Sequence, residues 1–467
     1  MLNFQHEYHW FFDIRYEPCT DFFVKAGRNL FMNKSYLFFF LLSVTHFCMQ
    51  AQEMIGLSQS NYSGLMGTFL NPANVVGSAI QREYNVLGGD FSLHNNYIYI
   101  PKGQFYNFDN YQGKNNEHGI ITDDYTVSPQ KNAYGNVLIA GPGILMSSDK
   151  NGFGIHTALR SALSARNIDY HLAKFMWDGF DYSPQHNIPY QTNPYEVILL
   201  SWYELGFTYG GAIVNNNTSY LSAGLTLNLD FSSNGLYVLS DKMDYIVPDS
   251  YLLIVNDINA GYGHKITKPE PKIKDYLNIK GYGGGLNFGI NYIHNRKPKA
   301  FALTNDREKK YDFKIGASVI DAGQLFFNKD ADVFKLENDS TYWPGIDTVE
   351  FASLWAVDAA IGNHFSGSPY GLLDGHKFSL YLPTAVSIQL DYAIIPRLYG
   401  YFDAVQRVGF DRSEVKRGNQ IAVGARYERT KFDAALQYSL YELKYSRIGI
   451  YFRHKWFYVG TSTFNAL

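Results

Sequence analysis

Residues 280–294 read KGYGGGLNFGINYIH, and two kinds of side chain alternate along them. Because strand side chains point to opposite faces with a period of two, one face carries Tyr282, Leu286, Phe288, Ile290 and Tyr292. The other face holds only glycine and asparagine between residues 283 and 291. A strand of about ten residues that is apolar toward lipid, polar toward a lumen and flanked by tyrosines is typical of a membrane-spanning β-barrel.

The same alternation recurs elsewhere in the chain. Residues 199–214 and 219–231 flank an Asn-rich turn and predict a hairpin, and the second of these segments alternates leucines with small or polar residues. Four further segments alternate after residue 376, within 386–392, 420–428, 432–440 and 448–453. An open sheet edge is not stable in lipid. We therefore predict an all-β fold, a transmembrane antiparallel β-barrel of about 14 strands.

Three segments interrupt this pattern. Residues 170–177 predict a short helix, while residues 233–275 and 328–372 predict long exposed loops, the second with a short helix near 352–361. Long loops of this kind are typical of the extracellular end of a barrel, where periplasmic turns are short.

Composition agrees with a barrel and excludes a bundle of membrane helices. Of the 467 residues, 17% are aromatic and only 18% are charged, and the mean hydropathy is −0.22. After residue 52, no run of about 18 apolar residues lacks a charge. We therefore expect no transmembrane helix in the mature chain.

The amino-terminal region predicts export. Residues 32–51 have a short basic start, an apolar run and a Met49-Gln50-Ala51 cleavage site, as a Sec signal peptide does. We expect translation to begin at Met32, so residues 1–31 would not belong to the native precursor. A lipoprotein is the alternative, but the residues before Cys48 are not small. Cys19 and Cys48 are the only cysteines, so the mature chain can form no disulfide.

Three phrases resemble known families. Asn71-Pro72-Ala73, just after the signal peptide, resembles the amino-terminal segment of FadL-like transporters of hydrophobic compounds. Together with residues 312–323 and 382–392, it resembles a Bacteroidota family of outer-membrane barrels related to accessory barrels of type IX secretion. The resemblance spans residue 55 to the end. It implies a FadL-like barrel in the outer membrane of a Gram-negative bacterium, without an assigned activity.

This resemblance implies a division of the mature chain. Residues 52–83 would form an amino-terminal plug, and residues 84–467 the barrel. Either residues 453–464 form the last strand of this barrel or the chain stops one strand short, and we favour the second alternative. Within the plug, Asn71, Pro72, Ala73 and Asn74 would form a hatch that moves to admit a ligand. The alternative is that they form only the turn into the first strand.

Six charged residues fall on the polar faces of predicted strands: Asp230, Asp391, Arg426, Glu428, Asp433 and Arg453. A basic group at the lipid midplane would cost about 2–4 kcal/mol, so these side chains require a lumen. They either form a charge network that fills the lumen or line a permeation path.

The sequence offers no motif for catalysis or cofactor binding. It lacks the zinc-protease, nucleophile-elbow and phosphate-loop motifs, and glycines 281–285 lie within a strand pattern rather than before a helix. His156, His171, His264 and His294 are scattered without ligand spacing, and no basic cluster suggests nucleic acid. We predict no enzyme activity, no metal and no cofactor.

Two functions remain open at this stage. The first is passive uptake of small hydrophobic compounds across the outer membrane. The second is a structural or accessory barrel that holds a surface or secretion partner through the two long loops. A secreted β-sandwich that binds glycans is a third alternative, but its strands would not repeat a small, polar second face.

Overall fold

The structure is a computed structural model of the 467-residue chain. The chain divides into two units, Met1–Cys48 and Met49–Leu467, and all residues described below lie in the second. These are residues 54, 56–99, 122–123, 128–216, 218–266, 279–295, 310–328, 331–349 and 353–465. The predicted non-native residues 1–31 and the predicted signal peptide 32–51 lie outside these ranges.

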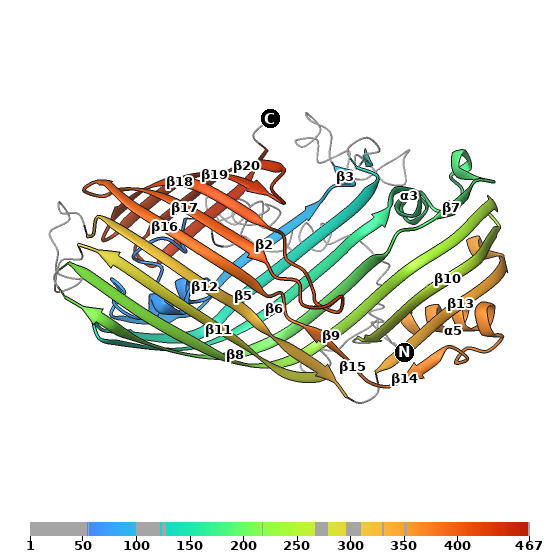
Figure 1. The fold of residues 1–467 in the computed structure, drawn as a ribbon, viewed down its shortest axis with the longest axis horizontal. Coiled ribbons are helices and arrows are strands. Elements are labelled where there is room, and N and C mark those ends of the chain that lie inside the picture. The colour runs from blue at the N-terminus through green and yellow to red at the C-terminus, as the bar shows by residue number, and fades with distance from the viewer. Residues whose placement is uncertain are drawn as a thin grey trace, which may run out of the picture. The chain divides into compact units, whose positions relative to one another are not determined.

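Antiparallel strands make up most of the described chain (Figure 1). The main series consists of β1 (Arg82–Asn85), β2 (Gly88–Asn95), β5 (Gln130–Ser147), β6 (Asn151–Asp169), β8 (Tyr195–Asn215), β9 (Ser219–Asp249), β11 (Gly281–His294), β12 (Phe313–Phe327), β16 (Ala385–Ile395), β17 (Leu398–Arg407), β18 (Gln420–Arg429), β19 (Phe432–Tyr441), β20 (Tyr445–His454) and β21 (Phe457–Asn465). The remaining strands are β3 (Ile98–Tyr99), β4 (Thr122–Asp123), β7 (Pro189–Gln191), β10 (Leu252–Lys265), β13 (Asp332–Pro344), β14 (Leu373–Gly375) and β15 (Phe378–Tyr381). Helical segments are η1 (Met66–Thr68), η2 (Pro72–Val75), α3 (Tyr170–Asp178), η4 (Ser183–Gln185), η5 (Ile346–Thr348) and α5 (Leu354–Ser366).

Strands of the main series pair with their neighbours in chain order. Both β1 and β2 pair with β5, and the series then runs through β6, β8, β9, β11, β12 and β16 to β21. The sheet curls so that its two ends approach each other. This is seen in the hydrogen bond from Arg447 of β20 to the ring of His94 in β2, at 2.9 Å. Within the described residues, these ends meet through side chains rather than through a backbone ladder.

The two faces of the sheet differ in polarity as predicted. On β9, Leu227 and Leu229 are 52% and 49% exposed, whereas Asp230 is fully buried. Leu227 lies opposite Leu286 of β11, which is also exposed, so the apolar positions form a continuous band across neighbouring strands. An outer apolar band around a polar interior is the surface that a β-barrel presents to lipid.

The predicted loops 233–275 and 328–372 were wrong over most of their described length. Residues 233–249 continue β9, residues 252–265 form β10, and residues 332–344 form β13, which pairs with β10. These strands lack a clean apolar face because they extend beyond the apolar band. One of their faces packs under helices instead, in a cluster that includes Phe175, Tyr245 and Phe334.

Both predicted helices are present. Residues 170–178 form α3, and residues 354–366 form α5, which ends five residues later than predicted. The hydroxyl of Ser353 caps the start of α5 by accepting a bond from the Ala356 amide, and Gly367 ends it in the left-handed conformation (φ 73°). No helix in the described residues is long and apolar enough to cross a membrane.

Candidate functional site

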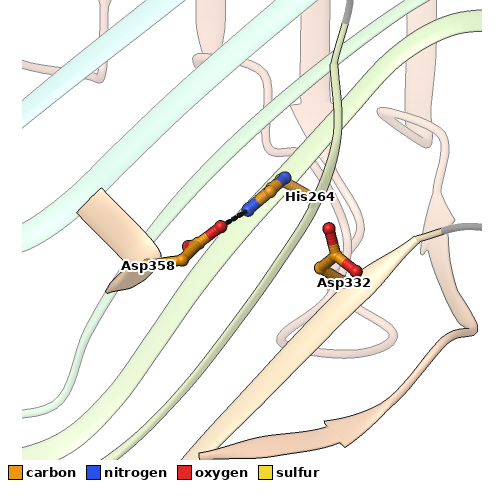
Figure 2. Close-up of side chains that lie close together, drawn as sticks. All are labelled: His264, Asp332 and Asp358. Atoms are coloured by element: carbon orange, nitrogen blue, oxygen red, sulfur yellow. Dashed lines mark hydrogen bonds and ion pairs between the residues drawn. The ribbon is translucent and has the colours of Figure 1, made fainter. Parts of the chain in front are cut away.

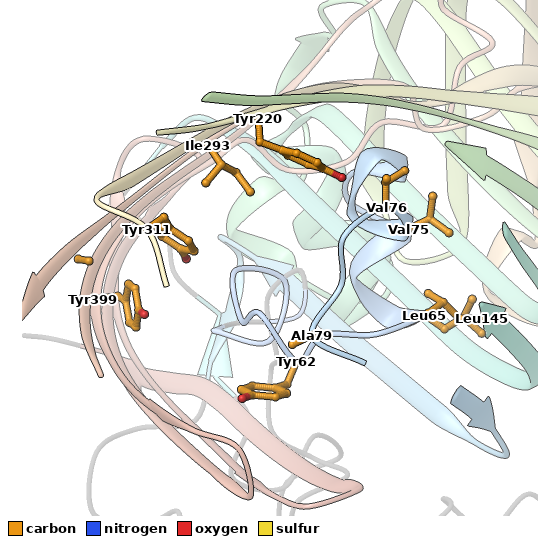
Figure 3. Close-up of a cluster of buried hydrophobic side chains, with 11 residues drawn as sticks. Tyr62, Leu65, Val75, Val76, Ala79, Leu145, Tyr220, Ile293, Tyr311 and Tyr399 are labelled. Carbon is orange, nitrogen blue, oxygen red and sulfur yellow. The ribbon is translucent and has the colours of Figure 1, made fainter. Parts of the chain in front are cut away.

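The candidate site is the segment at residues 56–80, which we call the plug, and the inner wall that surrounds it. Its side chains pack against widely separated strands (Figure 3). Leu65, Val75 and Val76 share one buried cluster with wall residues of β5, β9, β11 and β17: Leu145, Tyr220, Ile293 and Tyr399. Since these strands are far apart in the series, the plug occupies the interior of the curled sheet.

Four glycines of adjacent strands seat the plug. A Cβ added to Gly152 of β6 would lie 2.0 Å from the Val75 carbonyl oxygen, and one on Gly224 of β9 would lie 2.5 Å from the Pro72 carbonyl. Gly210 of β8 and Gly289 of β11 meet side chains of the same segment just as closely. Gly152 and Gly224 thus allow close approach of the plug backbone, and Gly289, on the small face of residues 283–291, leaves room for the Asn71 and Pro72 side chains.

Asn71 makes the most extensive contacts of the four predicted hatch residues. Its side-chain oxygen accepts a bond from the Ala73 amide at 3.0 Å and so caps η2. Its amide nitrogen lies within hydrogen-bond distance of the Ile290 carbonyl (3.2 Å), the Asn291 oxygen (3.0 Å) and the Gln389 oxygen (2.9 Å). Asn71 therefore joins the plug to β11 and β16.

The other three hatch residues extend the same contact. Pro72 and Ala73 begin η2 and are buried, and Ala73 is fully so. The Asn74 oxygen accepts bonds from Asn291 and from Lys314 of β12, both at 2.9 Å. The four residues lie together against the wall, and their role as a movable hatch stays a prediction.

Five of the six predicted lumen charges form a buried group near the plug. Arg426 forms ion pairs with Asp391 at 2.7 Å and with Glu428 at 3.0 Å. Arg453 donates hydrogen bonds to both carboxylate oxygens of Asp433. The plug contacts this group directly. The Ser60 hydroxyl donates to Asp433 at 2.7 Å, the Asn61 amide nitrogen donates to Glu428 at 3.0 Å, and Gln59 donates to Asp403 at 2.8 Å.

Lys310, in the connection that precedes β12, adds a cation to this group. Its ammonium pairs with Glu428 and lies 3.9 Å from the centre of the Tyr62 ring. Burial, the largest single influence, lowers the pKa of Lys310, but the charges and hydrogen bonds of Glu428 and Tyr62 together outweigh burial and raise that pKa above its ordinary value. Lys310 therefore stays charged and helps to neutralise the carboxylates.

Asp230, on β9, belongs to a different group of charged residues, whose other members lie on β6, β8 and β12. It lies opposite Glu204 in the β8–β9 ladder, and neither of its oxygens has a hydrogen-bond partner in the described part of the chain. Glu204 contacts His156 and Arg160 through its two carboxylate oxygens, and Arg160 also donates hydrogen bonds to both oxygens of Asp321. The sequence reasoning missed Arg160, Glu204 and Asp321, although Arg160 and Glu204 lie in alternating segments where the same face rule would have found them.

A narrow cavity lies between the plug and this second group. Met54, Phe69, Leu70, Leu138 and Ile320 supply its apolar lining, and Asp90, Asn136, Arg160, Asp321 and Arg417 supply the polar part. Because Phe69 and Leu70 belong to the plug, the size of the cavity depends on the position of the plug. Its volume is about 30 Å³, so with the plug in this position it admits no more than a water-sized molecule, and a larger compound could enter only if the plug moved.

Residues 72–462 match the family described as "Family of unknown function (DUF5723)", so the chain belongs to that family. No curated protein matches the chain. The Bacteroidota origin and the link to secretion stay predictions.

Three solved structures are similar to this chain at low sequence identity. The toluene transporter TodX of Pseudomonas putida is 11% identical, with 84% of this chain and 92% of that chain covered and a TM-score of 0.32. A deltaS2 mutant of the TodX monoaromatic hydrocarbon channel is 11% identical over 84% and 85%, with a TM-score of 0.37. The ferric yersiniabactin uptake receptor FyuA of Yersinia pestis is 10% identical over 80% and 46%, with a TM-score of 0.24.

Proposed function

We propose that this member of the family is an outer-membrane barrel for passive uptake of small hydrophobic compounds, gated by its plug. The observation that carries the proposal is the seat of the plug. Side-chain amide hydrogen bonds, a bond from the Lys314 ammonium and glycine contacts hold residues 71–76 against the wall, and Phe69 and Leu70 line a cavity next to them whose other walls are partly charged.

A seat without ion pairs suits a gate. Breaking a buried ion pair costs about 3–5 kcal/mol, whereas a typical neutral hydrogen bond contributes about 0.5–1.5 kcal/mol. Residues 71–74 bond the wall through side-chain amides and the Lys314 ammonium, and the plug meets carboxylates through its earlier part, at residues 59–61 and 65. The later part can therefore move while the earlier part stays anchored.

A reversible tether tests both the transport and the gate. An added Cβ on Gly210 lies 2.7 Å from Cγ1 of Val75, close to the separation of about 3 Å between a Cβ and the far sulfur of a disulfide. The variant Val75→Cys/Gly210→Cys carries no cysteine after residue 48 other than this pair. It is reconstituted into liposomes and assayed for uptake of a labelled fatty acid, oxidised and reduced.

We expect uptake above that of empty liposomes in the reduced state, loss of uptake on oxidation and recovery with a reductant. The single variants Val75→Cys and Gly210→Cys are the controls and should not respond to oxidation. The second also shows the effect of the added Cβ itself, which lies 2.5 Å from Cγ2 of Val76. If reduced and wild-type protein take up no more fatty acid than empty liposomes, the transport proposal fails. Equal uptake by the oxidised and reduced forms would reject gating by this segment.

The second candidate, an accessory barrel, is favoured by one observation. The folded extension built from β10, β13 and α5 exposes large aromatic side chains, including Tyr342 (64%), Trp355 (63%) and Tyr370 (57%). A photo-crosslinker at Trp355 in the native host should then capture one protein that a crosslinker at exposed Trp456, in the β20–β21 turn, does not. The same products from both positions would count against a partner on the extension.

A further inference from the structure

We infer that the extension contains a binding site for a divalent transition-metal ion, with zinc the best fit. His264 of β10, Asp332 of β13 and Asp358 of α5 each offer one ligand atom, and these three atoms lie within 4.8 Å of one another (Figure 2). The site is separate from the plug and does not depend on the proposed transport.

The backbone holds these side chains together. His264 and Asp332 are direct partners in the β10–β13 ladder, so their side chains lie on the same face of the sheet. Asp358 comes from α5, which packs on that face through Ile361 and Phe365. The histidine Nε2 and an Asp358 oxygen are already 2.9 Å apart.

The second Asp358 oxygen points to an unmet requirement. Asp358 is only 4% exposed and lies close to the Tyr262 hydroxyl, yet neither its Oδ1 nor that hydroxyl has a hydrogen-bond partner of good geometry in the described chain. Within the same residues, no lysine or arginine forms an ion pair with Asp358 or Asp332. A buried carboxylate oxygen without a partner is costly, and a bound cation would compensate it.

A second histidine stands beside the triad. The Nδ1 atom of His376, just after β14, lies 3.8 Å from an Asp332 oxygen and close to the Ala331 carbonyl at 3.2 Å. It is exposed and can rotate, so it can supply a fourth ligand when a metal binds. Two imidazole nitrogens and two carboxylate oxygens would form a closed four-ligand set.

The donor types select the ion. Imidazole together with carboxylate favours zinc and neighbouring transition metals, whereas calcium and magnesium prefer oxygen ligands alone. The site contains no sulfur, which a copper(I) site would require. The ring of Phe334 stacks near His264, at 6.2 Å between ring centres, and gives the site an apolar side.

Such an ion would join α5 to the sheet. Three of the ligand elements are separated by long stretches of chain, so a metal held between them would restrict their separation. In the bound state we expect the extension to resist protease more strongly, because binding to the folded form stabilises it.

The test uses tag-free, full-length protein in detergent, stripped of metal and titrated with Zn²⁺ by calorimetry. We expect saturable binding of one ion per chain. Asp358→Asn keeps the size and a polar contact to His264 but removes the ligand charge, and it should weaken zinc binding at least ten-fold, as should His264→Gln. His454→Gln, which changes an exposed histidine at the opposite end of the barrel, is the matched control and should bind zinc as the wild type does.

Two further readouts keep the result decisive. Zn²⁺ should slow protease cleavage within the extension of the wild type but not of Asp358→Asn, and the gel mobility of unboiled samples verifies that each variant is folded. Absence of saturable zinc binding, or equal binding by the His264, Asp358 and His454 variants, would overturn the site. Unchanged affinity in His376→Gln would remove His376 from the ligand set, and tighter binding of Ca²⁺ than Zn²⁺ would overturn the choice of metal.

Discussion

At the scale of single residues, Asn71 makes several of the hydrogen bonds between plug and wall. It is both an acceptor for the Ala73 amide and a donor toward three wall oxygens. Each buried polar group left without a partner costs about 1–3 kcal/mol. A single substitution can therefore separate the capping role of Asn71 from its wall contact.

We expect Asn71→Asp to release the plug at least as strongly as Asn71→Ala. Aspartate keeps the acceptor that caps η2, but it cannot donate to Gln389 or Asn291 and brings a negative charge against their oxygens. The readout is the labelling rate of Ala73→Cys, a fully buried position, by a maleimide reagent. Release of the plug should raise this rate about ten-fold, the equivalent of 1.4 kcal/mol. Slower labelling in Asn71→Asp than in Asn71→Ala would show that the cap matters more.

The buried arginine of the charge group gives a stronger effect. Arg426 is fully buried and pairs with Asp391 and Glu428, so Arg426→Ala leaves two buried carboxylates poorly compensated. We expect a loss of about 3–5 kcal/mol in stability, measured as a lower temperature at which the unboiled gel band disappears. Arg429→Ala, at an exposed position on the same strand, should change that temperature little; equal shifts would argue against a stabilising charge group.

The sequence predicted part of this site for a clear reason. Asp391, Arg426, Glu428, Asp433 and Arg453 were placed inward because they alternate with apolar residues, and all five are buried. The pairing between them depends on strand register, which alternation does not determine. The proposed zinc ligands are not evident in the sequence, where His264 has no ligand spacing, because Asp332 and Asp358 lie 68 and 94 residues farther along the chain.

At the scale of elements, glycine positions determine where η2 can sit. A Cβ on Gly224 would meet the Pro72 backbone at 2.5 Å, and a backbone atom cannot rotate away as a side chain can. By contrast, a Cβ on Gly211, in the adjacent strand, has no neighbour closer than 3.7 Å. These two glycines provide a matched pair.

We expect Gly224→Ala to displace η2 and increase the ion conductance of the barrel in planar bilayers, since the plug would no longer fill its seat. Gly211→Ala should conduct as the wild type does. Closed, wild-type-like records from Gly224→Ala would mean that the wall gives way instead of the plug. The conductance therefore shows whether the plug or the barrel wall moves to accommodate the added methyl group.

The extension shows where element prediction from sequence fails. Strands β10 and β13 pair across a separation of about 80 residues, and their outer faces need no apolar side chains because they lie beyond the apolar band. Helix α5 was predictable because Ser353 and Gly367 mark its ends locally. Local signals thus revealed the helix, whereas β13 depends on long-range pairing with β10, and β10 forms a local hairpin with β9 that lacks the alternating pattern.

At the scale of the whole molecule, the apolar band decides the environment of the barrel. Leu227, Leu286 and Ile388 belong to strands spread along the main series, and each is at least 39% exposed. In water such a continuous band would promote aggregation, whereas in lipid it is favourable. The alternation predicted from residues 280–294 therefore reflects a property of the entire sheet.

A charge on this band tests that environment directly. Leu227→Arg places a guanidinium near the middle of the band, which should reduce folding into lipid vesicles by about 2–4 kcal/mol if the band faces lipid. Thr218→Arg adds the same charge in the exposed β8–β9 turn, keeps the main-chain bond from residue 218 to the Asn216 side chain, and should fold as the wild type does. Folded fractions are read from the mobility difference between boiled and unboiled samples. Equal folding of the two variants would mean that Leu227 does not meet lipid, and the membrane orientation of the barrel would have to be revised.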